Sequence, residues 1–243
     1  MRSYETNTGQ KWASVTEIIG DATDKSKALT RWAANTACDY ARDTLDPIKI
    51  KARMGGMDYD MVLWHSVEEV LSDAKHAFWK VSDKALSIGS EVHSMAEGYL
   101  KGNRPDTVGR RDEVIHAYTA FLDWLNSVRF EIIETEMKVF GYWYGGTLDI
   151  KAKLNGVTTI IDLKTSKSLF PGYRYQVAAY RATQPDAEAC GVLRLDKETG
   201  IPEYRDTSKT FEQDLKVFNL MRDLFYNRHP RIAKKAGWIN RSA

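Results

Sequence analysis

The spacing of apolar residues changes near residue 129 and divides the chain into a helical part and a β-rich part. Before this point, apolar positions recur about every 3.6 residues, which is typical of amphipathic helices. After it, β-branched and aromatic residues alternate with polar ones between Gly-containing turns, which favours strands and hairpins. This order of elements predicts an α+β (α/β) fold, with a central β-sheet flanked by helices and preceded by a helical N-terminal part.

The same pattern predicts where the elements lie. Helices are expected over Glu17–Asp43, Tyr59–Val81, Asp83–Leu100 and Arg110–Ser127, with Pro47 marking a break after the first. Later elements are expected to be strands over Arg129–Tyr142, Thr147–Leu154 and Val157–Lys164, a helix over Gly172–Thr183, a hairpin over Gly191–Asp206 and a helix over Thr210–Asn227. The length of 243 residues is that of one domain, with residues 1–128 as its mainly helical part and residues 129–243 as its sheet core.

The dipeptide Asn155-Gly156 predicts a tight hairpin, because both central residues of a type I′ turn have positive φ. This turn fixes the register of the two flanking strands, so that Asp149 lies opposite Asp162 and Thr147 lies opposite Lys164. One face of the hairpin is then almost wholly apolar and is expected to be buried against helices: Leu148, Ile150, Ala152, Leu154, Val157, Thr159, Ile161 and Leu163.

The opposite face brings two carboxylates and an ammonium group together. In this register the Cβ atoms of Asp149 and Asp162 would be about 4.5–5.5 Å apart, where like charges repel. A divalent cation removes the repulsion by taking both carboxylates as oxygen ligands. Lys164 lies two residues after Asp162 and therefore on the same face. The alternative is a solvated surface pair of Asp162 and Lys164 that contributes little energy.

Two helical motifs flank this hairpin. Tyr173, Gln176 and Tyr180 are spaced i, i+3 and i+7, which gives the predicted helix a polar and aromatic stripe instead of an aliphatic one. Upstream, His93 and Glu97 are four residues apart and share one face of another predicted helix.

Together, Gly146–Asp149, Ile161–Lys167 and Tyr175–Tyr180 resemble the core motifs of the PD-(D/E)XK nuclease superfamily. They are similar in particular to its RecB-like exonuclease branch, which adds an upstream Gly-x-x-x-His, matched here by Gly89–His93. The segment from Ser14 to Trp32 is similar to phage exonucleases and to the mitochondrial genome-maintenance exonuclease. The resemblance covers about residues 12–183 and implies a restriction-endonuclease-like core with a central mixed β-sheet. Leu148 replaces the proline of the superfamily's name, which is a common variation.

The resemblance also implies roles for the motif residues. The implied metal ligands are His93, Asp149, Asp162 and the backbone carbonyl of Leu163, with Glu97 either holding a second metal through water or orienting His93. These ligands favour Mg²⁺, with Mn²⁺ as a substitute. The cation would activate a water for attack on phosphorus. Lys164 would position or deprotonate that water, and Gln176 and Tyr180 would orient the water, the lysine or the phosphate. Two cysteines are too few for the four-cysteine iron–sulfur cluster of some relatives, so no such cluster is expected.

Contacts with DNA are expected from basic and aromatic side chains, because phosphate contacts supply most sequence-independent affinity. The side chains assigned to this role are Lys27, Arg31, Trp32, Lys167 and Arg174. Glu136 lies on the strand before the hairpin, where it either faces the same cleft or points outward. The net charge of only +2 does not by itself indicate a nucleic-acid binder, and the basic stretch over residues 228–241 is either a further DNA contact or a solvated tail.

No apolar run reaches the roughly 18–20 residues of a membrane helix, and the N-terminus lacks the pattern of a secretory signal. A cytoplasmic protein of a bacterium or a phage-infected cell is therefore expected. Its expected partners are DNA with a free end and, from the resemblance, a recombination or single-strand-annealing protein. The oligomeric state is not predicted.

The predicted activity is that of a Mg²⁺- or Mn²⁺-dependent DNA exonuclease acting on ends in recombination, repair or replication. An endonuclease of the same fold that cuts branched or single-stranded DNA is the nearest alternative, because the shape of the channel decides between them. A non-catalytic DNA-binding module is disfavoured by the intact Asp149, Asp162 and Lys164. A glycosidase would use two carboxylates but would give Lys164 no role.

Overall fold

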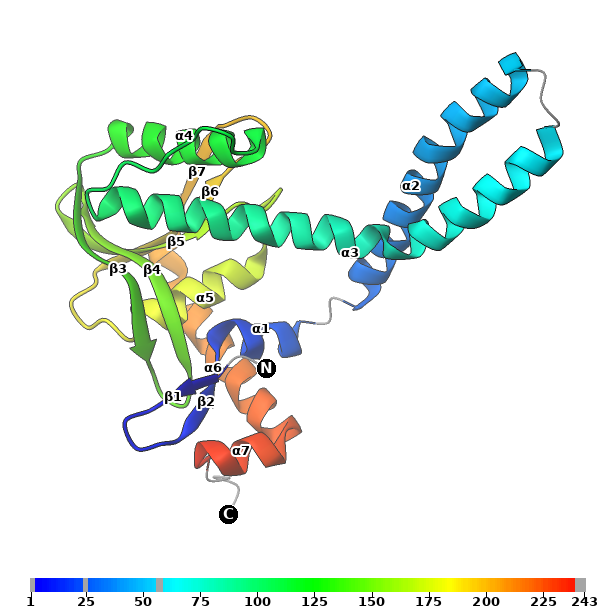
Figure 1. Cartoon of the computed structure of the whole chain (residues 1–243). Coiled ribbons are helices and arrows are strands. Elements are labelled where there is room, and N and C mark those ends of the chain that lie inside the picture. Colours follow the sequence, from blue (N-terminus) through cyan, green and yellow to red (C-terminus); the bar gives the residue numbers. More distant parts are fainter. Residues whose placement is uncertain (1–2, 24–25, 56–58, 239–243) are drawn as a thin grey trace. The chain divides into compact units, whose positions relative to one another are not determined.

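The computed structural model describes residues 3–23, 26–55 and 59–238. Contacts divide the chain into two compact units (Figure 1). We call residues up to Thr23 together with those from Ile88 onward the sheet unit, and residues Asp24–Ser87 the helical unit. That these units form one nuclease domain stays a prediction.

The elements of the two units follow one another along the chain. They are β1 (Ser3–Glu5), β2 (Lys11–Ala13), α1 (Val15–Ala22), α2 (Ser26–Gly55), α3 (Tyr59–Leu100), α4 (Asp112–Ser127), β3 (Phe130–Phe140), β4 (Gly145–Leu154), β5 (Val157–Lys164), α5 (Pro171–Arg181), β6 (Ala189–Leu195), β7 (Pro202–Asp206), α6 (Phe211–Arg228) and α7 (Pro230–Ala236). Among the described residues, no helix is both long enough and apolar enough to cross a bilayer.

The sheet unit is built around a five-stranded sheet in the order β3-β4-β5-β6-β7. The β5–β6 pair is parallel and the other neighbouring strands are antiparallel, so the sheet is mixed. Helix α5 connects the two parallel strands, as such a crossover requires. The predicted α+β fold with a central mixed sheet is therefore confirmed.

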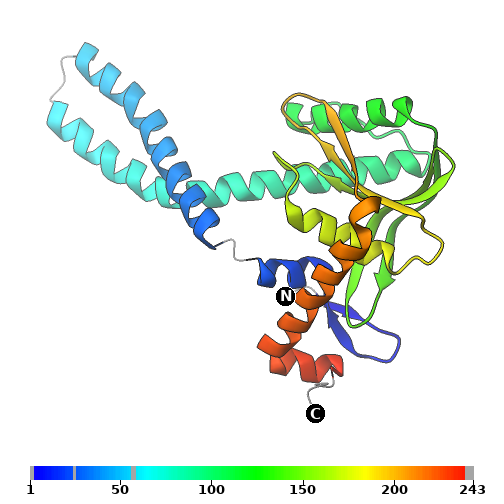
Figure 2. The same cartoon turned by 180° about the vertical axis from the view of Figure 1, so that it is seen from behind.

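Helices cover both faces of this sheet, as the two opposite views show (Figures 1 and 2). On one face, α1, α5 and α6 pack their apolar side chains against sheet residues such as Ile160 and Val192. On the other face, α4 and the part of α3 from Ile88 onward pack against Ile161 and Leu193. Successive residues of β5 enter opposite cores, which explains why its sequence is apolar at consecutive positions.

The predicted β4–β5 hairpin has the expected register over five residue pairs, from Leu154–Val157 to Ile150–Ile161. Its turn residues have φ values of 53° at Asn155 and 91° at Gly156, as a type I′ turn requires. The local turn signal therefore determined the pairing of this part of the two strands correctly.

Three predicted helix boundaries are wrong. The helix predicted over Glu17–Asp43 is divided in two: α1 ends at Ala22, because Thr23 has an extended backbone (φ −97°, ψ 103°), and α2 begins at Ser26. Pro47 lies inside α2 instead of ending it, and the helices predicted over Tyr59–Val81 and Asp83–Leu100 form the single helix α3. A proline removes one main-chain hydrogen bond but keeps a helical φ, so an exposed helix can continue past it with a local distortion. No glycine or proline lies between Trp79 and Ile88, and nothing in the sequence ends the helix there.

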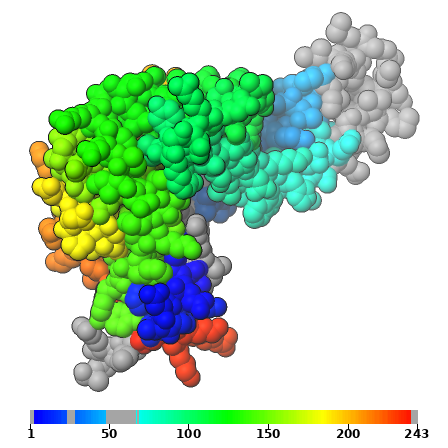
Figure 3. All heavy atoms as spheres, turned by 60° about the vertical axis from the view of Figure 1, so that its left-hand side comes forward, coloured from blue at the N-terminus to red at the C-terminus, as the bar shows by residue number. Residues whose placement is uncertain are grey.

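Three short elements, β1, β2 and α7, were not predicted. The short β1–β2 pair contacts β3 through Tyr4 and Trp12, whose rings lie 6.3 and 6.2 Å from that of Phe140. Helix α7 occupies part of the basic stretch near the C-terminus and contacts β2, and Figure 3 shows the two segments side by side. Strands of three residues and a helix of seven residues are too short to give a periodic signal.

The two thiols test the position of β6. Cys190 is fully buried in this strand, and burial raises the pKa of its thiol, whereas Cys38 in α2 is exposed. We expect one thiol of the native protein to react rapidly with Ellman's reagent and the second only on unfolding, because the thiolate is the reactive form. The Cys38→Ser protein should show no rapid phase. Rapid reaction of both thiols in the native protein would contradict this placement of Cys190.

Candidate metal centre

Strands β4 and β5 separate at the end that carries the two aspartates. Their pairing ends at Ile150–Ile161, whereas β5 stays paired with β6 as far as Lys164. Asp149 and Asp162 therefore do not form the paired rung that the turn predicted. Instead, the backbone N–H of Leu163 donates a hydrogen bond of 2.7 Å to Asp149 Oδ2, so the Asp149 side chain bridges from β4 to β5.

The alternation of side chains along β4 also breaks at Asp149. Leu148 was predicted to share a face with Ile150, and this is wrong. Leu148 packs into the core beneath α1 and α5, whereas Ile150 packs into the core beneath α3 and α4. Residues two apart in a regular strand point to the same face, so the backbone between these two is irregular. This irregularity places Asp149 where it can reach the part of α3 in the sheet unit.

The neighbouring strand β3 is distorted at the same level. Thr135 pairs with Ile150 and Met137 pairs with Leu148, so Glu136 lies opposite Asp149. Glu136 has a φ of 51°, a left-handed conformation that costs a residue other than glycine about 1–3 kcal/mol. Such strain often marks functional sites.

Three side chains from different elements meet at this point. His93 of α3 places Nδ1 3.6 Å from Asp149 Oδ1 and 4.0 Å from Glu136 Oε1. The potential ligand atoms of the three residues all lie within 4.8 Å of one another, so the cluster could hold a metal ion. Two carboxylates and one imidazole suit Mg²⁺ or Mn²⁺. Glu136, whose orientation the sequence left open, thus faces the cluster.

The charges of the cluster are strongly coupled. Burial lowers the pKa of His93, but the neighbouring carboxylates of Asp149 and Glu136 outweigh it and raise this pKa to about 10. The pKa of Asp149 is lowered because, although burial opposes its ionisation, His93 and Lys164 stabilise the anion. Without a cation, an imidazolium therefore offsets one of the two carboxylate charges. Metal ligation requires the neutral imidazole, so a bound ion would take the place of this proton.

A second group of side chains surrounds Asp162 on the α5 face of the sheet. The Asp162 side chain is 1% exposed, and its Oδ2 lies 2.5 Å from Lys164 Nζ. Its Oδ1 accepts a hydrogen bond of 3.0 Å from Gln176 Nε2, which lies 3.3 Å from the hydroxyl oxygen of Tyr180. The ring of Tyr173 lies beneath the ammonium group, with Lys164 Nζ 5.1 Å from its centroid. The structure thus brings together five residues singled out by the sequence: Asp162, Lys164, Tyr173, Gln176 and Tyr180.

Asp162 is destabilised as an anion in this setting. Burial raises its pKa to about 6, and the charge of Asp149 adds to the shift. Lys164 opposes that rise, and Asp162 in turn raises the pKa of the Lys164 ammonium despite its burial. A cation bound at Asp149 would stabilise both carboxylates.

Two glycines of the motifs allow these elements to approach closely. A Cβ at Gly146 of β4 would lie 2.4 Å from Cε1 of the Tyr180 ring, which is buried and cannot move aside. A Cβ at Gly89 of α3 would lie 3.3 Å from Thr165 Oγ1, just after β5. Gly146 is therefore required by the packing of α5 on β4, whereas a Cβ at Gly89 would make a tight contact that a small shift of the Thr165 side chain would have to relieve.

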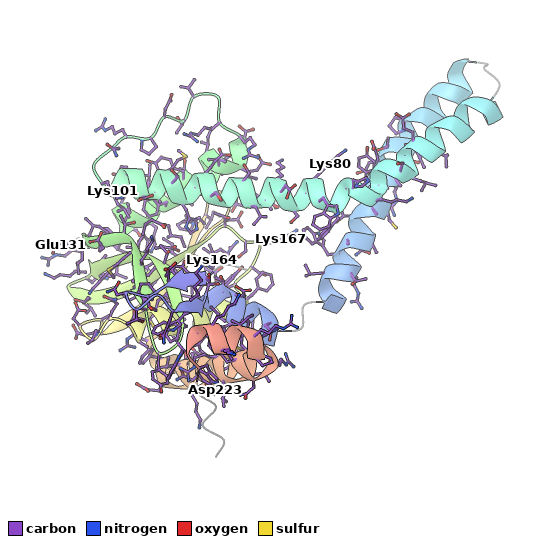
Figure 4. All side chains as sticks on the ribbon, turned by 60° about the horizontal axis from the view of Figure 1, so that its bottom comes forward. Lys80, Lys101, Glu131, Lys164, Lys167 and Asp223 are labelled. Carbon is purple, nitrogen blue, oxygen red and sulfur yellow. The ribbon has the colours of Figure 1, made fainter. Side chains whose placement is uncertain are left out.

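The remaining predicted site residues lie outside the cluster. Glu97 pairs with Lys101 at 2.5 Å. Lys167 is exposed after β5, and Arg174 of α5 lies 3.5 Å from Asp214 Oδ1. In Figure 4, Lys164 lies among the elements of the sheet unit, whereas Lys101 and Glu131 lie at its edge.

The other predicted DNA contacts belong to α2 in the helical unit. Arg31 and Trp32 are exposed there, and the Trp32 ring lies 4.8 Å from that of Phe78. The side chain of Lys27 lies outside the described residues.

Comparisons with known proteins add one structural likeness. No family model matches the chain, and no curated protein matches it. Among solved structures, the chain is similar to the crystal structure of an alkaline exonuclease (LHK-Exo) from Laribacter hongkongensis. The similarity has a TM-score of 0.30 at 12% identity and covers 60% of this chain and 84% of the exonuclease chain. A likeness of this degree assigns neither a family nor an activity.

Proposed function

We propose that the protein is a metal-dependent nuclease that hydrolyses DNA phosphodiester bonds. The main support is the convergence of His93, Glu136 and Asp149 with the buried pair of Asp162 and Lys164. The hydrogen bond from Leu163 to Asp149 joins the two groups. Such a set combines ligands for a hard cation with an ammonium group. In phosphoryl transfer, a metal ion and a cationic side chain both stabilise the charge that develops on the phosphate.

Each residue of the site would have a distinct task. His93, Glu136 and Asp149 would hold the cation, with Asp162 and the Leu163 carbonyl completing the ligands. A divalent cation bound there would supply Lewis-acid activation of the phosphate and of a water. Lys164, held by Asp162, would position that water and neutralise charge that develops on the phosphate. Gln176 would fix the orientation of the Asp162 carboxylate, with the Tyr180 hydroxyl beside it.

A DNA exonuclease that acts on ends in recombination, repair or replication is the finer form of this proposal. It rests on the resemblance of the Asp149, Asp162–Lys164 and Gln176–Tyr180 motifs to the RecB-like branch. An endonuclease of the same fold would use the same chemistry.

The first prediction from the proposed function separates an exonuclease from an endonuclease and tests whether cleavage requires a metal. We expect linear single- and double-stranded DNA to be degraded in Mg²⁺ or Mn²⁺ and not in the presence of a chelator, because the carboxylates cannot activate water alone. Circular single-stranded DNA should persist under the same conditions, and a time course on gels would follow all three substrates. Rapid cutting of the circle would show an endonuclease. Undiminished degradation with chelator present would refute the metal-dependent mechanism.

The second prediction concerns Lys164. Its replacement by alanine should lower the single-turnover rate about 100-fold or more, because a positioned charge at the phosphate acts mainly in the transition state. Binding of the same DNA, measured by fluorescence anisotropy, should change far less. Lys153→Ala is the matched control, since Lys153 lies on the same hairpin in an exposed pair with Glu131. Full activity in both Asp162→Ala and Lys164→Ala would rule out the assigned site.

The third prediction concerns Glu136, which the sequence motifs do not include. Glu136→Gln should raise the Mn²⁺ concentration needed for half-maximal cleavage by about tenfold or more, since it removes a charged ligand. The same shift should appear in Mn²⁺ binding measured by electron paramagnetic resonance. Glu131→Gln, on the same strand with an exposed side chain, provides the control. Identical Mn²⁺ dependence of the two variants would remove Glu136 from the metal site.

A further inference from the structure

A small cavity lies beside the candidate active site, between the start of α5 and strands β6 and β7. Its volume is about 190 Å³, below the roughly 300–1,000 Å³ of pockets that enclose a drug-sized molecule. Its walls include Phe170, Tyr173 and Arg174 from α5 and the residue before it, and Val192 and Arg205 from the strands. Among the described residues that line it, two are arginines and none is acidic. The size and charge fit a phosphate group.

The register of the sheet ties this cavity to the catalytic carboxylates. Asp162 pairs with Val192, and Val192 pairs with Arg205, so the three residues form one rung across β5, β6 and β7. Neighbouring strands are about 4.8 Å apart, which puts the backbone of Arg205 about 10 Å from that of Asp162. That distance equals the axial rise of roughly three nucleotides of B-form DNA, and an extended strand spans it with fewer.

Tyr173 lines both the candidate active site and the cavity. Its ring lies beneath Lys164 Nζ, at 5.1 Å, and also lines the cavity. Phe170 is 52% exposed and packs edge-on against Tyr173, with the ring centroids 5.7 Å apart. An exposed ring next to a cationic hollow provides a surface on which a base can stack.

The two arginines are held so that they can bind an anion. Arg174 is anchored at 3.5 Å by Asp214, a buried carboxylate that also accepts a hydrogen bond from Thr210 Oγ1. Arg174 Nε is buried and has no hydrogen-bond partner among the described residues. Arg205 pairs with Glu203 at 3.0 Å, and Arg194 pairs with the other oxygen of Glu203 and with Asp196, so Arg205 has only a shared carboxylate as its partner among these residues. The first turn of the eleven-residue α5 adds the positive end of a helix.

We propose that this cavity binds a phosphate of the DNA strand that is being cleaved, but not the scissile phosphate itself. Binding of this second phosphate would set the position of the strand in the active site. The proposal rests on the proposed nuclease function. The bound group is a phosphate oxyanion, from either a terminal monoester or an internal diester. Phe170 would stack against the adjoining base.

The test measures DNA binding in the full-length protein without metal. Three internally labelled single-stranded oligonucleotides of one sequence carry a 5′-phosphate, a 3′-phosphate or no terminal phosphate, and fluorescence anisotropy gives their affinity over a range of salt concentrations. The variants are R205Q and R174Q. R129Q is the matched control, because Arg129 is an exposed arginine just before β3, the strand at the opposite edge of the sheet.

We expect R205Q to weaken binding fivefold or more and to lower the steepness of log K against log salt by about 0.7, the value for one phosphate contact on a single strand. R129Q should change neither. A loss confined to one end-phosphorylated oligonucleotide would identify the terminal monoester, and an equal loss on all three would identify an internal diester. The salt slope distinguishes a lost phosphate contact from a structural defect. R205Q is the safer variant for folding, because the Arg205 side chain is half exposed. R174Q, in contrast, leaves the buried Asp214 without its ion pair.

Unchanged affinity and salt slope in both R205Q and R174Q would overturn the proposal. If the unmodified protein still degraded DNA with metal in that case, the cavity assignment alone would fail. A protein that neither bound nor degraded DNA would overturn the nuclease function, and the cavity assignment with it.

Discussion

The hydrogen bond from the Leu163 amide to the Asp149 carboxylate is the interaction on which the site depends. Where β4 leaves β5, main-chain pairing between them stops, and a buried polar group still needs a partner. One oxygen of Asp149 meets the Leu163 N–H, and the other faces His93. A single side chain therefore joins β5, which carries Asp162 and Lys164, to the cluster formed with α3 and β3. Any displacement of Asp149 would disturb both groups at once.

The charge balance of the site explains why these groups can be buried together. Asp149, Asp162 and Glu136 offer three negative charges against the one permanent positive charge of Lys164. Without metal, a protonated His93 supplies a second positive charge, and burial raises the pKa of Asp162 to about 6. A divalent cation with a neutral His93 would balance the three carboxylates fully. The arrangement is thus electrostatically most favourable in the state in which it would act.

Local sequence signals predicted the parts of this structure that local physics determines. Asn155-Gly156 fixed the hairpin register because the turn requires positive φ, and Val157–Lys164 was found with its exact bounds. The position of Leu148 was missed because alternation assumes a regular strand, whereas tertiary contacts distort β4 beside Asp149. The orientation of the Glu136 side chain could not be predicted, because a glutamate in a sequence does not indicate a left-handed backbone conformation. The register of β3 against β4, which places Glu136 opposite Asp149, is the information that would have predicted this orientation.

The two faces of the sheet differ in the side chains that they carry near the candidate site. On the α3 and α4 side, Ile150, Ile161 and Leu193 form an apolar core, and of the site residues only His93 comes from a helix of this side. On the α5 side, one rung across the strands begins at Asp162 and ends at Arg205, with the apolar Val192 between these two charged residues. Because Asp162, Lys164 and Arg205 come from paired strands, their positions are set by the sheet and not by a loop. A rigid sheet of this kind can hold a carboxylate and a distant arginine at a fixed separation, as the proposed contacts with two phosphates of one DNA strand would require.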